Sequence, residues 1–159
     1  MSDKLLLCVI LTVSCTLAGF AVGKYFKVRK EYFVELDDLL LRFSSNLTFT
    51  LDTVPKMLSS YETKSSLLSR QLAAAVSTMS GDKKELPSGY LSKSEFVFVD
   101  GMFGALGTYN SVAEKCANEN NRLKLKEYRE ASESKYNKLG KSCVKLGFLL
   151  GLLLAVLFW

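Results

Sequence analysis

The chain of 159 residues contains no histidine, the side chain that most often serves as a general base or metal ligand near neutral pH. Its four cysteines form no Cys-x-x-Cys pair, so we expect reduced structural thiols rather than a zinc site. Neither G-x-x-x-x-G-K-[ST] nor G-x-G-x-x-G occurs, which removes the common phosphate-binding loops. The carboxylates Asp37 and Asp38 are expected on a solvated helix face. We therefore expect no enzyme, and no catalytic, cofactor-binding or metal-binding residues.

Charge is absent from two stretches. Residues 5–22 (LLLCVILTVSCTLAGFAV) are apolar over a length that suits a transmembrane helix. Residues 146–159 are apolar too, and no proline follows Asn110, so we expect one helix that runs from water into a bilayer. This second stretch gives roughly 21 Å of helix against a bilayer core of ~30 Å. The missing length can be supplied if the span starts at Cys143 and the bilayer thins locally. The alternatives are a tail that enters one leaflet and a buried core helix of a soluble protein.

Basic residues flank both apolar runs on the side of the central segment. Such cations resist translocation, so a hairpin is expected, with residues 24–145 in the cytoplasm and both termini across the membrane. All charged residues except Asp3 and Lys4 lie in this segment, which accounts for the net charge of +5. Anionic lipid explains a basic excess beside a membrane, so no nucleic-acid partner is expected. The flanking cations are Lys24, Lys27, Arg29, Lys30, Lys135, Lys138, Lys141 and Lys145.

A cleaved N-terminus is the competing interpretation of the first apolar run. Thr12-Val-Ser-Cys15 loosely resembles a lipoprotein signal that ends at Cys15, although Thr12 stands where Leu is expected. The leading Met-Ser-Asp-Lys is weakly cationic for a signal peptide. The basic cluster that follows the run favours an uncleaved anchor instead.

Each apolar run contains two glycines four residues apart, Gly19 and Gly23 in the first and Gly147 and Gly151 in the second. Small residues at this spacing let membrane helices approach closely, so the two pairs are candidates for packing against each other. Glycine is also frequent in membrane helices without such a role.

The central segment shows helical patterns throughout. Apolar residues from Tyr25 to Leu47 recur at three- and four-residue steps. Further helices are predicted around Val54–Tyr61 after a break, over Leu67–Met79 with an end at Gly81, and from the capping box Ser92–Glu95 to Gly107. The fold class is therefore predicted to be all-α, with a transmembrane helix at 5–23, a small cytosolic helical bundle at 24–145 and a C-terminal transmembrane helix at 146–159.

The order of these motifs resembles the stage III sporulation protein AB family. The blocks that carry the resemblance are Leu39–Leu58 (LLLRFSSNLTFTLDTVPKML), Leu91–Asn110 (LSKSEFVFVDGMFGALGTYN) and Gly140–Val156 (GKSCVKLGFLLGLLLAV). That family is known as part of the channel between mother cell and forespore, and is similar to platform proteins of type II secretion and type IV pilus machines. The resemblance implies a domain on the mother-cell side of the outer forespore membrane. It would contact a secretion-type ATPase and other sporulation channel proteins, and an oligomer is compatible with it.

The resemblance also indicates a partner face. Pro55 matches a family Pro, and Leu106–Gly107 matches a family Leu-Gly; Asn46 stands where Glu is usual, and the segment 61–89 is shorter than in the family. Phe49, Thr50 and Asn110 occupy positions that usually carry Tyr, Gly and Asp. The candidate partner-binding residues are Phe49, Thr50, Pro55, Leu106, Gly107 and Asn110.

Three functions are consistent with these patterns. The first is a non-enzymatic, membrane-anchored scaffold that positions a cytosolic motor ATPase. The second is an exported lipoprotein or signal-anchored helical binding module, and the third is a membrane sensor built on a two-helix hairpin.

Overall fold

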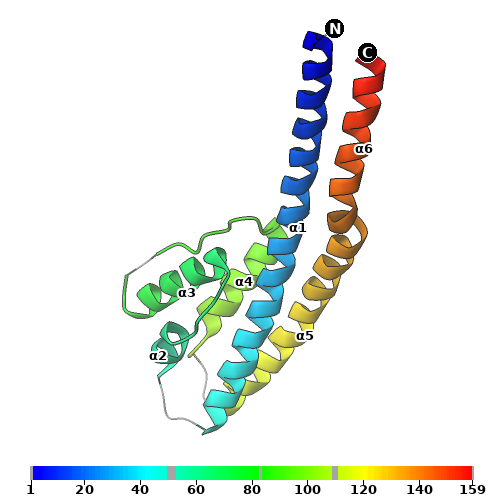
Figure 1. Cartoon of the computed structure of the whole chain (residues 1–159). Helices are drawn as coiled ribbons and strands as arrows, with labels where there is room; N and C mark the ends of the chain where they lie inside the picture. Colours follow the sequence, from blue (N-terminus) through cyan, green and yellow to red (C-terminus); the bar gives the residue numbers. More distant parts are fainter. Residues whose placement is uncertain (1, 50–52, 83, 109–110, 159) are drawn as a thin grey trace. The chain divides into compact units, whose positions relative to one another are not determined.

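The computed structural model describes residues 2–49, 53–82, 84–108 and 111–158, with the backbone alone for residues 2–5, 48, 49, 111 and 158. Within these ranges all regular structure is helical, which confirms the predicted all-α class. The sequence Phe96–Val99, strand-like when taken alone, lies inside a helix. The elements are α1 (Ser2–Phe49), α2 (Val54–Ser59), α3 (Ser66–Met79), α4 (Lys93–Ala105), α5 (Ser111–Lys135), the π-helical turn η1 (Tyr136–Gly140) and α6 (Lys141–Phe158) (Figure 1).

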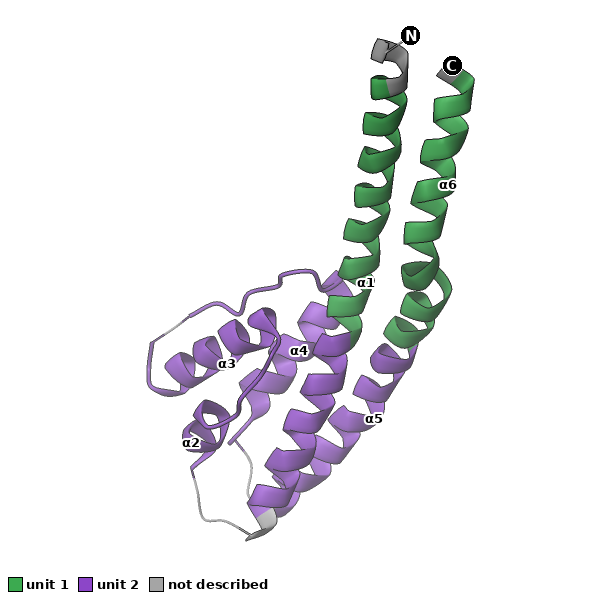
Figure 2. Cartoon of the chain, viewed as in Figure 1, with its two compact units in different colours: residues 1–30, 131–159 green, residues 31–130 purple. Residues whose placement is uncertain are grey.

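The chain divides into two compact units (Figure 2). Unit 1 consists of residues 1–30 and 131–159, and unit 2 consists of residues 31–130. Unit 1 thus contains both apolar runs together with the basic residues that flank them, whereas unit 2 contains the amphipathic helices of the central segment.

Unit 1 is a pair of antiparallel helices, one from the start of α1 and the other from the end of the chain (Figure 2). The thiol of Cys8 donates a hydrogen bond of 3.5 Å to the carbonyl of Ala155, so the two helices touch near both termini. The hydroxyls of Thr12 and Thr16 donate to carbonyls one turn earlier, at 2.9 and 2.8 Å. Polar groups satisfied within their own helix can be tolerated in hydrocarbon.

Unit 2 has one apolar core to which every one of its helices contributes. The part of α1 in this unit supplies the predicted stripe, with Tyr32, Phe33 and Leu36 fully buried. Phe33 stacks on Tyr128 of α5 at a centroid distance of 6.0 Å. The buried core residues are Tyr32, Phe33, Leu36, Leu39, Leu40, Phe43, Met57, Leu58, Leu67, Leu68, Leu72, Ala75, Val99, Met102, Phe103, Leu106 and Leu125.

The ends of α3 and α4 follow the predicted local signals. The backbone N–H of Ser92 donates to the Glu95 carboxylate at 2.8 Å, which confirms the capping box that opens α4. Beyond α3 and α4, Gly81 and Gly107 have φ of +100° and +80°. Residues with a Cβ rarely adopt this conformation, so glycine stops both helices where the sequence predicted.

Residues 112–157 form one continuous helix, as predicted, but its turn Tyr136–Gly140 is π-helical, which the sequence did not indicate. Its hydrogen bonds skip one more residue than those of an α-helix and widen the turn. Gly140 is buried at its end, and a Cβ there would lie 2.7 Å from Cδ2 of Tyr136 and 3.2 Å from Cβ of Phe26. The widened turn and the missing side chain together accommodate the Tyr136 ring against α1.

Candidate functional site

A groove of about 780 Å³ opens on unit 2 where α2, α3 and α4 meet. It combines apolar walls with a few polar groups, among them Lys84, Glu85 and Asp100. Three of the predicted partner-binding residues line it: Pro55 from the first turn of α2, and Leu106 and Gly107 after α4. The remaining lining residues are Thr53, Val54, Ala75, Thr78, Met79, Leu86, Phe103, Gly104 and Thr108.

Gly107 fixes the corner of this groove. A Cβ at this position would lie 3.2 Å from Cγ2 of Val54, and the φ of +80° disfavours any other residue. Its N–H donates to the carboxylate of Glu114 at 3.0 Å, and Glu114 is itself buried. The corner is therefore held on one side by α2 and on the other by the first turn of α5.

The positions of the other three predicted partner residues relative to the groove are not described. Thr50 and Asn110 lie outside the described residues, as does the side chain of Phe49. The groove also has a wall that the sequence did not indicate, formed by Ala75, Thr78 and Met79 of α3. Their helical periodicity predicted a helix, but nothing in it showed that its C-terminal half would face Pro55.

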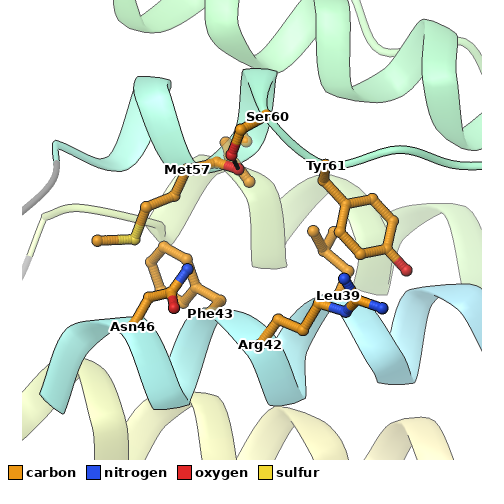
Figure 3. A pocket seen from close by; sticks show the side chains of 8 residues that line it. Leu39, Arg42, Phe43, Asn46, Met57, Ser60 and Tyr61 are labelled. Atoms are coloured by element: carbon orange, nitrogen blue, oxygen red, sulfur yellow. Dashed lines mark hydrogen bonds between the residues drawn. The ribbon is translucent and has the colours of Figure 1, made fainter. Parts of the chain in front are cut away.

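A smaller cavity of about 110 Å³ lies between α1 and the α2 segment (Figure 3). Arg42 extends beneath Tyr61 at one end, with its guanidinium carbon 5.5 Å from the ring centroid. Arg42 also pairs with Asp38, at 3.0 Å from Nε to Oδ2. The other side chains that line the cavity are Leu39, Phe43, Asn46, Met57, Leu58 and Ser60.

Tyr61 belongs to a polar connection that fixes the loop after α2 to α1. Its hydroxyl donates to the carbonyl of Glu35 at 3.0 Å and to the Asp38 carboxylate at 3.1 Å. Burial, helped by the hydrogen bond to Asp38, raises the pKa of Tyr61 to about 12, so the phenol remains a donor at physiological pH. The Glu35 carboxylate accepts from the backbone N–H groups of Lys64 and Ser65 at 3.1 and 3.0 Å. Tyr61 and Glu35 thus connect the loop after α2 to α1.

The prediction that Asp37 lies on a solvated face was wrong. Its side chain is only 20% exposed and accepts hydrogen bonds from Nε of Arg122 at 3.1 Å and Nη1 of Arg129 at 3.0 Å. The two arginines are seven residues apart on α5, so they share one helix face. Asp37 therefore joins α5 to α1.

In unit 1 the helices approach each other along glycines. A Cβ at Gly19 would overlap the carbonyl oxygen of Cys143, and one at Gly23 would lie 2.9 Å from the carbonyl oxygen of Gly140. Helix backbones can come this close only where side chains are missing. Gly140 was not among the predicted packing residues, although it lies seven residues, about two helical turns, before Gly147 and therefore on the same helix face.

The same close packing continues toward the termini. A Cβ at Gly147 would lie 2.6 Å from the carbonyl oxygen of Cys15 and 3.3 Å from Cα of Gly19, so the structure brings Gly19 and Gly147 together. A Cβ at Gly151 would lie 2.8 Å from Cα of Thr12. Gly151 thus meets a threonine rather than a glycine of the other helix.

The sequence model of the stage III sporulation protein AB (spore_III_AB) family matches residues 4–159, essentially the whole chain. The chain belongs to this family. No curated protein and no solved structure matches it. Membership makes this a sporulation stage III protein, and it places the groove and the glycine contacts in a member of that family.

Two helices of this stage III protein are long and apolar enough to cross a membrane, within Leu6–Leu47 and Val112–Leu157. Their most apolar 18-residue windows have mean hydropathies of 2.3 and 1.8, and only 6% and 11% of these windows is buried. A core helix of a soluble protein would be mostly buried. The two candidate spans and the sporulation family fit a membrane protein.

Among the described residues, no group of three or more Cys, Asp or Glu side chains is arranged to hold a metal ion. Two buried polar side chains of unit 2, Tyr32 and Gln71, form hydrogen bonds within the fold. Tyr32 donates to Gln71 at 2.6 Å, and Gln71 donates to the carbonyl of Pro87 at 2.9 Å. Burial, above all, raises the pKa of Tyr32 above its usual range.

Proposed function

We propose that this protein is a non-enzymatic, membrane-anchored scaffold of the sporulation channel, a secretion-like complex, and that it positions a cytosolic motor ATPase at the membrane. The observation that carries the proposal is the groove of unit 2, which gathers Pro55, Leu106 and Gly107 from two separate segments. The family resemblance indicates the same three residues as part of a partner face.

The groove has the composition of a protein-binding surface. Apolar side chains such as Val54, Met79 and Leu86 supply area that a partner can remove from water. Lys84, Glu85 and Asp100 provide charged groups that can fix the orientation of the partner. Gly107 and Val54 hold the corner rigidly, so little ordering would be needed on binding.

The titratable groups of unit 2 support a scaffold rather than a catalyst. Asp37, Glu35 and Tyr61 each connect two segments of the fold through hydrogen bonds or ion pairs. A general acid or base needs a proton-transfer partner and access to a substrate. The bonds that these groups form give each of them a structural role.

The orientation of the scaffold follows from the charges beside the spans. Four cations follow the first apolar run and four precede the second. Because such residues stay on the cytoplasmic side, we expect residues 24–145 to lie in the cytoplasm, on the mother-cell side of the outer forespore membrane.

Introducing two positive charges at the groove should weaken partner binding. We expect the double variant Pro55→Lys, Thr108→Lys of the full-length protein to bind the secretion-type ATPase of the channel about 30-fold more weakly, as expected when a central part of an interface is disrupted by about 2 kcal/mol. Both positions line the groove, and Thr108 is exposed, so the fold should tolerate the changes. Pull-down from detergent solution measures the effect.

The matched control places the same charges elsewhere on unit 2, in the variant Val97→Lys, Asn120→Lys. Both residues are exposed and neither lines the groove. The control should bind like the unmodified protein. Unchanged binding by the groove variant, or equal losses in both variants, would refute the groove as the partner face.

A further inference from the structure

Positive charge is concentrated in unit 1. This unit holds nine Lys and Arg residues against two carboxylates, a formal charge of +7, whereas unit 2 holds twelve against fourteen, a formal charge of −2. Eight of the nine cations lie in two short segments, 24–30 and 135–145, next to the apolar runs. The basic character of the protein is thus confined to the ends of the candidate membrane spans.

Three side chains of this basic region converge on one point. The ammonium groups of Lys30 and Lys141 lie 5.4 and 5.7 Å from the centroid of the Tyr136 ring. Both distances are within the range of a cation–π contact. Lys30 comes from α1 and Lys141 from α6, so both helices of unit 1 contribute to this cluster.

The π turn creates the cluster. In a regular α-helix, residues five positions apart point about 140° away from each other, so Lys141 could not reach the ring of Tyr136. The wider turn Tyr136–Gly140 brings them to the same side. Buried Gly140 has no side chain, which leaves room beside it for both the Tyr136 ring and Phe26 of α1.

The charges within the cluster are not balanced. Lys30 pairs with the carboxylate of Glu133 at 3.1 Å. Lys141 is exposed, and among the described residues none of the ion pairs formed includes it. The cluster therefore contains two ammonium groups and one carboxylate, which leaves one positive charge available to bind an anion.

We propose that the Lys30–Tyr136–Lys141 cluster binds the phosphate of an anionic phospholipid headgroup. Its position decides between a lipid and a free phosphate. The exposed apolar residues of the second apolar run begin at Leu146, five residues after Lys141, and those of the first run, residues 5–22, end at Val22, eight residues before Lys30. A headgroup at the cluster would therefore have its acyl chains beside lipid-facing side chains. This site is separate from the groove and does not depend on an ATPase partner.

Lipid titration followed by native mass spectrometry of the full-length protein tests the site. We expect phosphatidylglycerol to bind more tightly than phosphatidylcholine, and the variant Lys141→Gln to weaken phosphatidylglycerol binding about five-fold, the effect of one lysine near a charged surface. Lys138→Gln removes the same charge from the same basic region and should have a clearly smaller effect, because the cation–π contacts of the Tyr136 ring among the described residues come from Lys30 and Lys141. Glu133→Gln should act in the opposite direction and tighten binding.

Specific outcomes would overturn this proposal. Equal weakening by Lys141→Gln and Lys138→Gln would show a diffuse electrostatic attraction without a site. Equal affinities for phosphatidylglycerol and phosphatidylcholine would exclude recognition of the headgroup charge. Tight binding of inorganic phosphate that depends on Lys141 would show that the lipid is not the ligand. The Glu133→Gln variant keeps both lysines and the ring, so its result remains informative if a lysine variant folds poorly.

Discussion

Phe33→Ala should destabilise unit 2 more than any other single truncation considered. Phe33 is fully buried, lies edge-on to Tyr32 with ring centroids 5.2 Å apart, and stacks on Tyr128 of α5. Removing a buried phenyl ring costs about 3–5 kcal/mol through lost burial and the cavity left behind. For a chain of this size, the melting temperature should fall by about 6–20 °C. Far-ultraviolet circular dichroism of the detergent-solubilised protein measures it.

The control makes the same truncation on the same helix. Phe20 of α1 is 59% exposed, so Phe20→Ala removes a ring that contributes little to packing within the chain. Its melting temperature should stay close to that of the unmodified protein, as surface changes usually alter stability by less than about 0.5 kcal/mol. Similar shifts for both variants would contradict the assignment of Phe33 to the core.

Gly19→Leu should separate the two helices of unit 1. The new side chain would have to occupy the space of the Cys143 carbonyl, and backbone cannot move aside as a flexible side chain can. Overpacking of this kind costs about 1–3 kcal/mol or more, which shifts the ratio of paired to separated helices by about 5- to 150-fold. The expected result is a loss of helix pairing with both helices still formed, since leucine favours helix.

Disulfide formation between the helices measures this pairing. The Cys8 thiol reaches the carbonyl of Ala155, so Ala155→Cys, in a chain whose other three cysteines are serine, should allow oxidative cross-linking to Cys8. Gly19→Leu should reduce the cross-linked fraction, whereas Ala18→Leu, at an exposed neighbouring position, should not. An unchanged cross-linked fraction in Gly19→Leu would show that the close approach at Gly19 is not needed.

Local sequence signals predicted the ends of several helices because the stabilising groups lie within a few residues of each other. The Ser92–Glu95 capping box and the glycines after α3 and α4 need no distant partner. The apolar stripe of α1 that includes Phe33 was likewise visible from its spacing. These features follow from hydrogen bonding and periodicity along one helix.

Features that depend on residues far apart could not be predicted in this way. Asp37 meets its arginines across 85 and 92 residues, and nothing near Asp37 distinguishes it from a solvated carboxylate. The helical pattern predicted the long helix, but it gave no sign of the π turn at Tyr136–Gly140, where Gly140 lies close to Phe26 of α1. In the groove, Pro55 and Gly107 were indicated by the family resemblance alone, and the wall from α3 was missed.

The net positive charge of the protein is confined to unit 1, which contains the two apolar runs. With a formal charge of +7 on unit 1 and −2 on unit 2, the part of the chain that would bind a protein partner is slightly acidic. A nucleic-acid-binding protein would carry its basic surface on the folded domain. The cations lie instead beside the apolar runs, as expected if they fix the orientation of the spans and attract anionic lipid.

The central claim is that the domain between the two spans faces the cytoplasm, and Cys116 provides a native probe for it. This cysteine is exposed on α5, whereas Cys8, Cys15 and Cys143 are partly buried in unit 1. A membrane-impermeant maleimide should leave Cys116 unlabelled in intact cells and label it after permeabilisation, with Cys116→Ser identifying the signal. Labelling of Cys116 in intact cells would place the domain outside, as expected of an exported lipoprotein, and would contradict the scaffold account.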